Sequence, residues 1–175
     1  MRIIAGEWRG RRISAPGGRG VRPTTDRIRE AWMSALGSSI PGARIVDLFA
    51  GSGALGLESL SRGAASVTFV ERAREAQVAL GANIRVLAAG DRTKIVRDDV
   101  FRFLSRTPAA SFDLALADPP YGEGHAARLL ELVAATPFAR ELWVEHHSRE
   151  AIPDLPGLIH RRYGDTTLTI WELLE

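Results

Sequence analysis

The segment whose residues are best suited to binding and catalysis is Asp118-Pro119-Pro120-Tyr121. It follows the largely apolar run 112–117, which predicts a buried strand. Two prolines restrict the backbone and remove two amide hydrogens, so the carbonyls beside them are free to accept hydrogen bonds. A carboxylate, a fixed carbonyl and an aromatic ring suit an exocyclic amino group of a nucleic acid base, because they offer acceptors for its hydrogens and a ring that stacks on the base. We therefore expect these four residues to be catalytic.

Such an amino group is a weak nucleophile, because its lone pair is delocalised into the base. Hydrogen bonds to Asp118 and to the Pro119 carbonyl would favour a pyramidal nitrogen and direct its lone pair at an electrophilic methyl group. Asp118 could also take up the surplus proton, or that proton could pass to water. A base inside a duplex cannot reach such a pocket, so the substrate must be flipped out or unpaired.

A second group of residues surrounds a G-x-G-x-x-G pattern made by Gly51, Gly53 and Gly56. Together with Glu71, twenty residues after Gly51, this pattern alone would favour a dinucleotide. Asp47 argues against it, since a carboxylate beside that turn repels a pyrophosphate and attracts a ligand with a cationic end. S-adenosylmethionine carries an ammonium and a sulfonium, and we expect it here as the methyl donor. A nicotinamide-dependent dehydrogenase is the alternative.

Acidic residues at the ends of the next predicted strands fit the same donor. Glu71 is placed to accept hydrogen bonds from the ribose hydroxyls. Asp99 could accept one from the adenine amino group. Ordinary polar capping is the alternative for Asp47 and Asp99.

These groups need a scaffold in which strands alternate with helices. The hydrophobic pattern predicts strands at 44–49, 66–70, 94–97, 112–117 and 142–145, helices at 54–61, 73–87, 100–105 and 125–134, and a terminal hairpin at 158–163 and 167–171. Repeated strand–helix units predict an α/β, Rossmann-like fold with a mostly parallel sheet and an antiparallel C-terminal edge hairpin. In such a sheet ligands bind beyond the carboxyl ends of the strands.

An N-terminal extension precedes this scaffold. Residues 2–14 predict a β-hairpin, followed by a Pro/Gly-rich connector at 16–20. Thr24 or Thr25 can then cap a helix. The helix is expected to present one apolar face, made by Ile28, Ala31, Trp32, Ala35 and Leu36. We divide the chain into an extension, 1–42, and a methyltransferase domain, 43–175, that form one structural unit.

Composition narrows the class of protein further. The 175 residues fit one domain. The absence of cysteine excludes disulfides and thiolate zinc sites, and the four histidines form no metal cluster in the sequence, so we expect no metal. Neither a signal peptide nor a membrane span is predicted, which favours a cytoplasmic protein that does not bind membranes.

Charge is distributed unevenly along the chain. Residues 1–30 hold eight arginines against three acidic residues, a net charge of +5, whereas the other 145 residues sum to −3. Guanidinium groups suit bidentate phosphate contacts. We expect an RNA-binding surface formed by Arg2, Arg9, Arg11, Arg12, Arg22 and Arg27. The alternative is a solvated face that reflects a general arginine bias.

Several segments together resemble the RsmD family, bacterial methyltransferases that act on a guanine N2 of 16S ribosomal RNA. They are the segments 22–30, with Arg-Pro-Thr-Thr-Asp-Arg at its start, 49–58 and 118–121. The opening Arg-Ile-Ile-Ala-Gly at 2–6 and Tyr-Gly-Asp-Thr at 163–166 are also similar to it, so the resemblance covers nearly the whole chain. Only the Arg-Pro-Thr-Thr-Asp-Arg segment is specific to the family, and the residues 88–91 match no family feature.

The resemblance implies S-adenosylmethionine as cofactor and ribosomal RNA as partner, within the small subunit or an assembly intermediate. We expect the protein to be a monomer. The resemblance also implies that Thr25 closes over the donor. The implied donor-binding residues are Thr25, Asp47, Phe49, Gly51, Ser52, Gly53, Glu71, Arg72, Asp99, Val100 and Asp118.

Two other functions are left open by the residues. An adenine-N6 or DNA amino-methyltransferase could use the same motif, although no DNA target-recognition domain is evident. A non-catalytic RNA-binding protein with a degenerate donor pocket would have no need of intact Asp47 or Asp118.

Overall fold

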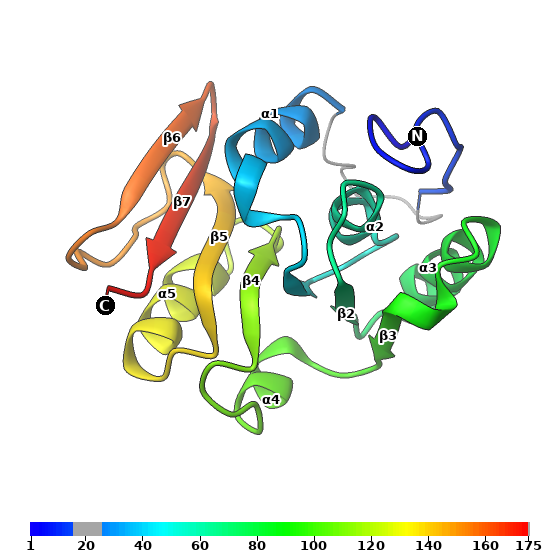
Figure 1. The fold of residues 1–175 in the computed structure, drawn as a ribbon. Coiled ribbons are helices and arrows are strands. Elements are labelled where there is room, and N and C mark those ends of the chain that lie inside the picture. Colours follow the sequence, from blue (N-terminus) through cyan, green and yellow to red (C-terminus); the bar gives the residue numbers. More distant parts are fainter. Residues whose placement is uncertain (16–25, 175) are drawn as a thin grey trace.

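The computed structural model describes residues 1–15 and 26–174 (Figure 1). The strands are β1 (Arg44–Leu48), β2 (Ser66–Val70), β3 (Thr93–Val96), β4 (Phe112–Ala117), β5 (Ala139–His147), β6 (Ile159–Tyr163) and β7 (Thr166–Glu172). The α-helices are α1 (Asp26–Leu36), α2 (Ala54–Ser61), α3 (Arg74–Val86), α4 (Val100–Leu104) and α5 (His125–Ala135), and two 3-10 helices are η1 (Gly37–Ser39) and η2 (Gly90–Arg92).

All seven strands form one sheet in the order β3-β2-β1-β4-β5-β7-β6. β1 to β5 are parallel, whereas β7 runs antiparallel between β5 and β6. The predicted α/β fold and its antiparallel C-terminal hairpin are confirmed. Since β1 lies between β2 and β4, the chain changes direction across the sheet between β1 and β4, which is where ligands bind in doubly wound sheets.

Helices cover both faces of this sheet (Figure 1). One core cluster joins α1, α2 and α3 to strand residues such as Ile45 and Phe69, and a second joins α4 and α5 to residues such as Val46 and Leu48. Successive strand side chains point to opposite faces, so strands buried on both sides are apolar throughout. None of the helices in the described parts of the chain is long and apolar enough to cross a membrane.

The N-terminal residues 1–15 reverse direction beside α2 and α3 (Figure 1). The predicted reversal is confirmed, but a single antiparallel bridge between Arg2 and Arg12 replaces the two expected strands. Gly6 allows the close approach to α2, with a positive φ of 86°. A Cβ at this position would lie 1.8 Å from the carbonyl oxygen of Ser61, so no other residue fits without moving the chain.

Side chains of α2 explain why no longer strand ladder forms at this end. The buried Glu58 carboxylate accepts hydrogen bonds from the amides of Ile4 and Ala5, at 2.8 and 3.0 Å. The amide of Trp8 donates to Ser61 Oγ at 2.9 Å. These amides are therefore satisfied by α2 instead of by a partner strand.

A buried arginine of α1 completes this junction. Arg29 is fully buried and donates to the carbonyl oxygen of Arg2 and to Asp26 Oδ1. Burial lowers the pKa of its guanidinium, whereas the charges of Glu58 and Asp26 raise it. Glu58 also pairs with Arg62 at 2.9 Å. The carboxylate of Glu58 thus joins the N-terminal residues, α1 and α2.

Two further elements differ from their predictions. The buried residues of α1 are Arg29, Trp32, Met33 and Leu36, so its buried face is rotated from the predicted one because Arg29 turns inward toward Glu58. β5 is longer than the predicted 142–145, because it pairs with β4 from Ala139 and with β7 as far as His147.

We predict that Glu58→Ala lowers the free energy of unfolding by about 3–5 kcal/mol, since it leaves the buried Arg29 without a major countercharge. Urea denaturation measures this change. The exposed Glu131 of α5 provides a matched control, and Glu131→Ala should stay within about 0.5 kcal/mol of the parent. Equal stability of the two variants would contradict the role of Glu58.

Candidate functional site

The site lies where β1 and β4 end side by side. Leu48 pairs with Ala117 in the parallel register. The next residues, Phe49 and Asp118, therefore follow neighbouring strands at the same edge of the sheet. The loop 49–53 between β1 and α2, called the glycine loop below, and the Asp-Pro-Pro-Tyr motif are brought together as the sequence predicted.

Carboxylates from two strands hold the glycine loop. Asp47, on β1, accepts a hydrogen bond from the Gly56 amide at 2.9 Å, and Glu71, after β2, accepts one from the Gly51 amide at 2.8 Å. Gly53 begins α2 with a φ of 84°, and a Cβ there would lie 2.4 Å from Leu80 Cδ1. The loop is thereby fixed close to the ends of both strands.

The electrostatics of this loop suit a cationic ligand. Burial raises the pKa of Asp47 well above its ordinary value, the Gly56 amide lowers it, and the charges of Asp118 and Glu71 raise it further. Three carboxyl groups from three adjacent strands thus lie near one another. A ligand that carries an ammonium or a sulfonium would offset their mutual repulsion.

Other residues predicted to contact the methyl donor already form hydrogen bonds or ion pairs within the protein. Glu71 also accepts from the Ala73 amide at 2.7 Å. Asp99 Oδ1 caps α4 by accepting from the amides of Phe101 and Arg102, and Arg72 lies 3.8 Å from Asp99 Oδ2. An ionised carboxylate offers about four acceptor positions, so Glu71 and Asp99 keep capacity for a ligand.

Two further predicted residues are buried. Val100 packs in the core beneath the start of α4. Ser52 is buried, and its carbonyl oxygen accepts from Asn83 Nδ2 at 3.0 Å. Asn83, on α3, also bonds the backbone of Ser14 in both directions, at 2.8 and 2.9 Å. The glycine loop is thus tied through Asn83 to the N-terminal residues.

Tyr121 is anchored by its hydroxyl group. The hydroxyl donates to Glu145 Oε1 at 2.8 Å and lies 3.2 Å from Thr166 Oγ1. Burial raises the pKa of Tyr121 to about 12, opposed by Thr166 and reinforced by Glu145, so the phenol stays protonated at neutral pH. The second oxygen of the buried Glu145 accepts from Trp32 Nε1 at 3.0 Å. Glu145 therefore connects the Asp-Pro-Pro-Tyr motif to α1.

Aromatic side chains form one wall beside Phe49. Phe49 adopts a φ of 59°, an uncommon conformation for a residue with a side chain. Its ring centroid lies 6.2 Å from that of Phe101 and 5.3 Å from that of His125. The guanidinium of Arg128 lies over Phe101, at 3.8 Å from the ring centroid. Residues of this kind suit stacking against a planar ligand.

The predicted RNA-binding arginines are exposed where they are described. Arg2 donates to the Gly10 carbonyl, Arg11 to the Val86 carbonyl on α3, and both keep other N–H groups. Arg9, Arg12 and Arg27 are exposed. Arg22 and Thr25 lie outside the described residues.

Four residues of the site were missed from the sequence: Glu145, Thr166, Asn83 and His125. Two of them had a detectable signal. Glu145 is a charged residue inside an apolar strand, and Asn83 is polar on the buried face of α3. His125 had none, and Thr166 stood out only as part of the family-like segment 163–166, because only the fold brings them near Phe49 and Tyr121.

The residues around the glycine loop fit S-adenosylmethionine as a ligand. The carboxylates of Asp47 and Glu71 both lie at the loop, and such acceptors suit the cationic aminoacyl group and the ribose hydroxyls of this ligand. Within residues 1–15 and 26–174, no group of three or more His, Asp or Glu side chains could hold a metal ion.

Comparisons with known proteins agree with this geometry. The family described as conserved hypothetical protein 95 matches residues 1–172. The chain is 36% identical over 160 residues to the Ribosomal RNA small subunit methyltransferase D of Escherichia coli (strain K12), covering 90% of this chain and 80% of that protein.

Solved structures give the same result. A hypothetical protein of Thermus thermophilus superposes with a TM-score of 0.83 at 30% identity over 99% of both chains. The 16S rRNA N2 G1207 methyltransferase (RsmC) of T. thermophilus, in complex with AdoMet and guanosine, has a TM-score of 0.67 at 21% identity and covers 90% of this chain and 45% of that one. This second likeness is one of fold. The chain belongs to the RsmD family, described as conserved hypothetical protein 95, and has the fold of S-adenosylmethionine-dependent methyltransferases.

Proposed function

We propose that the protein transfers a methyl group from S-adenosylmethionine to the exocyclic N2 of a guanine in 16S ribosomal RNA. The observation that carries this proposal is the position of Asp118 and Tyr121 at the end of β4, directly beside the glycine loop. The family relative named for the small-subunit RNA supports the choice of substrate.

Donor binding is assigned to the groups around the loop. Asp47 would face the ammonium, Glu71 the ribose, and Asp99 the adenine amino group, with Phe49 beside the adenine. When bound, S-adenosylmethionine supplies a methyl group made electrophilic by its sulfonium. Thr25 and Arg72 are further donor contacts in this proposal.

The protein's own part is to hold and orient the base. Asp118 and the Pro119 carbonyl accept the two amino hydrogens, and the ring of Tyr121 stacks on the base. Because its pKa is about 12, Tyr121 acts through its ring and does not accept the proton. Asp118 is the group able to take the proton, directly or through water.

The RNA surface is assigned to the arginines at the N-terminal end. Arg2 and Arg12 line a hollow of about 410 Å³ with Met1, Ile13 and Ser14. Such groups give salt-dependent contacts to phosphates. We place the reaction on the small subunit or an assembly intermediate, in the cytoplasm, with a monomeric enzyme.

Methyl transfer to small ribosomal subunits from cells that lack this protein tests the proposal. Labelled S-adenosylmethionine is offered with those subunits, with naked ribosomal RNA and with duplex DNA, and the product nucleosides are separated. We expect N2-methylguanosine from the ribosomal substrates. N6-methyladenosine, or label in DNA, would favour the alternative amino-methyltransferase. No transfer despite measured donor binding would overturn the proposal.

Asp118→Ala should lower the rate of methyl transfer by roughly 10²–10³-fold, because one of two acceptors that orient the amino group is lost. Donor affinity, measured by calorimetry, should change only a few-fold. Asp113→Ala is the matched control, since Asp113 lies near the start of β4, at the opposite end of the strand from Asp118, and pairs with the exposed Arg44. Unchanged turnover of the Asp118 variant would refute its role.

Donor affinity should rise with pH through the range in which Asp47 ionises. Burial raises the pKa of Asp47, so the protonated form persists above pH 3.8, and a cationic donor must displace that proton. Asp47→Asn keeps an acceptor for the Gly56 amide but should weaken donor binding by about 10–100-fold and abolish this pH dependence. Calorimetry at several pH values measures both. The same pH profile in parent and variant would count against Asp47 as the ammonium partner.

Glu145 is proposed as a positioning residue for Tyr121. Glu145→Leu removes the acceptor for Tyr121 and Trp32 and should lower kcat by about 10–100-fold at unchanged donor affinity, through misplacement of the base. Glu145→Gln should restore kcat to within a few-fold, because the Tyr121 hydroxyl can accept from the amide and donate to Thr166. Equal loss in the Gln and Leu variants would show that Glu145 does not act by holding Tyr121.

A further inference from the structure

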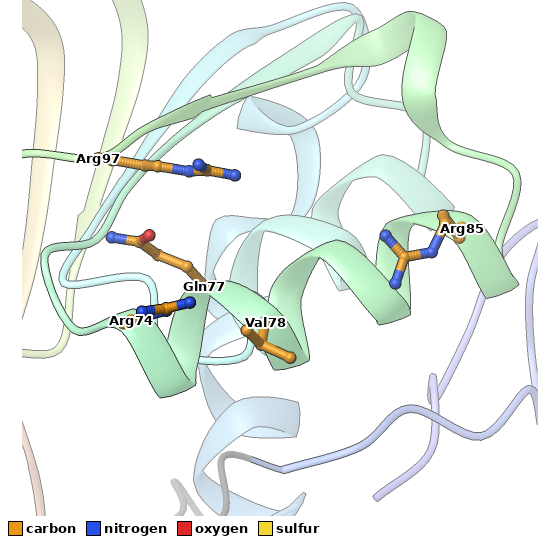
Figure 2. A pocket seen from close by; sticks show the side chains of 5 residues that line it. All are labelled: Arg74, Gln77, Val78, Arg85 and Arg97. Carbon is orange, nitrogen blue, oxygen red and sulfur yellow. The ribbon is translucent and has the colours of Figure 1, made fainter.

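A basic hollow lies beside α3 at the β3 edge of the sheet. It has a volume of about 300 Å³ and is lined by Arg74, Gln77, Val78, Arg85 and Arg97 (Figure 2). Four of these residues come from α3, and Arg97 follows β3. In Figure 2 Arg97 lies across from Gln77 and Arg74, with Arg85 at the far end of the helix. No predicted or assigned function includes this group.

The three arginines of this hollow carry unbalanced charge. All three are exposed, and no carboxylate within the described ranges lies at ion-pair distance from any of them. Other arginines of the chain, such as Arg92 and Arg102, are paired with carboxylates. Like charges around one hollow produce a positive potential that an anion would relieve.

The helix face is shaped to hold the charges together. Arg74, Gln77, Val78 and Arg85 recur at helical spacing, so they share one face of α3. Arg85 Nη1 lies 3.6 Å from the position that a Cβ at Gly81 would occupy, so its side chain folds back along the helix toward Gln77. The exposed Val78 adds an apolar surface between the charged groups.

The hollow lies along α3, which runs from the strand ends of the candidate site to the N-terminal arginines. Arg74 and Arg97 follow the carboxyl ends of β2 and β3. They therefore lie at the same end of the parallel strands as Asp118, which follows β4. β3 and β4 are three strand spacings apart, or about 15 Å at roughly 4.8 Å each. At the other end of α3, Arg11 donates to the Val86 carbonyl. The arginines of the hollow thus extend the N-terminal basic surface along α3 toward the site.

We propose that this hollow binds phosphate groups of the RNA backbone that flanks the target base. Each guanidinium can donate two N–H groups to one phosphate, the Gln77 amide can donate to a phosphate or sugar oxygen, and Val78 can contact a ribose. The inference rests on the proposed RNA methyltransferase function and extends its substrate surface to α3.

Equilibrium binding of small-subunit ribosomal RNA at several salt concentrations tests this site. The double variant Arg74→Ala/Arg97→Ala should weaken binding about tenfold. The slope of log K against log salt should become shallower by roughly 1.4, or about 0.7 for each lost single-strand phosphate contact. Val78→Glu, which places a carboxylate in the hollow without removing an arginine, should weaken binding by a similar factor. In methyl transfer, KM for the RNA should rise while kcat and donor affinity stay unchanged.

Matched controls lie on β6, the opposite edge of the sheet. Arg161→Ala with Arg162→Ala removes two exposed arginines, and Ile159→Glu converts an exposed apolar residue, so both should keep the parent affinity and salt slope. The proposal is overturned if the hollow variants also keep them, or if the β6 variants lose as much. If the parent protein neither binds nor methylates ribosomal RNA, the proposed function itself fails, which is a distinguishable result.

Discussion

The candidate site is built around the loop between β1 and α2, and two carboxylates hold that loop. Asp47 and Glu71 accept the amides of Gly56 and Gly51, so the loop is closed against the ends of β1 and β2. Burial of Asp47 and the nearby charges of Asp118 and Glu71 raise the pKa of this carboxyl, whereas the Gly56 amide lowers it. In the proposed function a cationic donor would offset the repulsion among these carboxyl groups, so the residues that fix the loop would also favour the charge of the donor.

Buried polar side chains attach the N-terminal part of the chain to the sheet. Glu58 binds the amides of Ile4 and Ala5, and Asn83 binds Ser14 and the glycine loop. Glu145 joins Trp32 of α1 to Tyr121. Such contacts need specific geometry, because an unpaired buried polar group is costly. The extension is therefore built into the donor side and the base side of the site together.

The protein separates its charges according to its two proposed ligands. Carboxyl groups lie inside, at the strand ends, where a cationic donor and a base amino group would be held. Arginines lie outside, at the N-terminal end and along α3, where a polyanion would run. The net charge of +2 conceals this division, since the 23 basic and 21 acidic residues of the whole chain nearly cancel. A short chain can in this way present surfaces of opposite sign to two ligands that must meet.

The sequence by itself determined the order of strands and helices, because periodic burial leaves a periodic apolar pattern. It also located Asp47, Glu71 and Asp118, because parallel strands place their carboxyl ends at one edge. Only the tertiary structure decided which face of α1 is buried, how far β5 extends and that one bridge replaces the N-terminal strands. These features depend on partners distant in the sequence, such as Glu58 for Arg29 and β7 for β5. The contacts of Glu145 and the hollow beside α3 were decided in the same way, since proximity between remote residues leaves no local pattern.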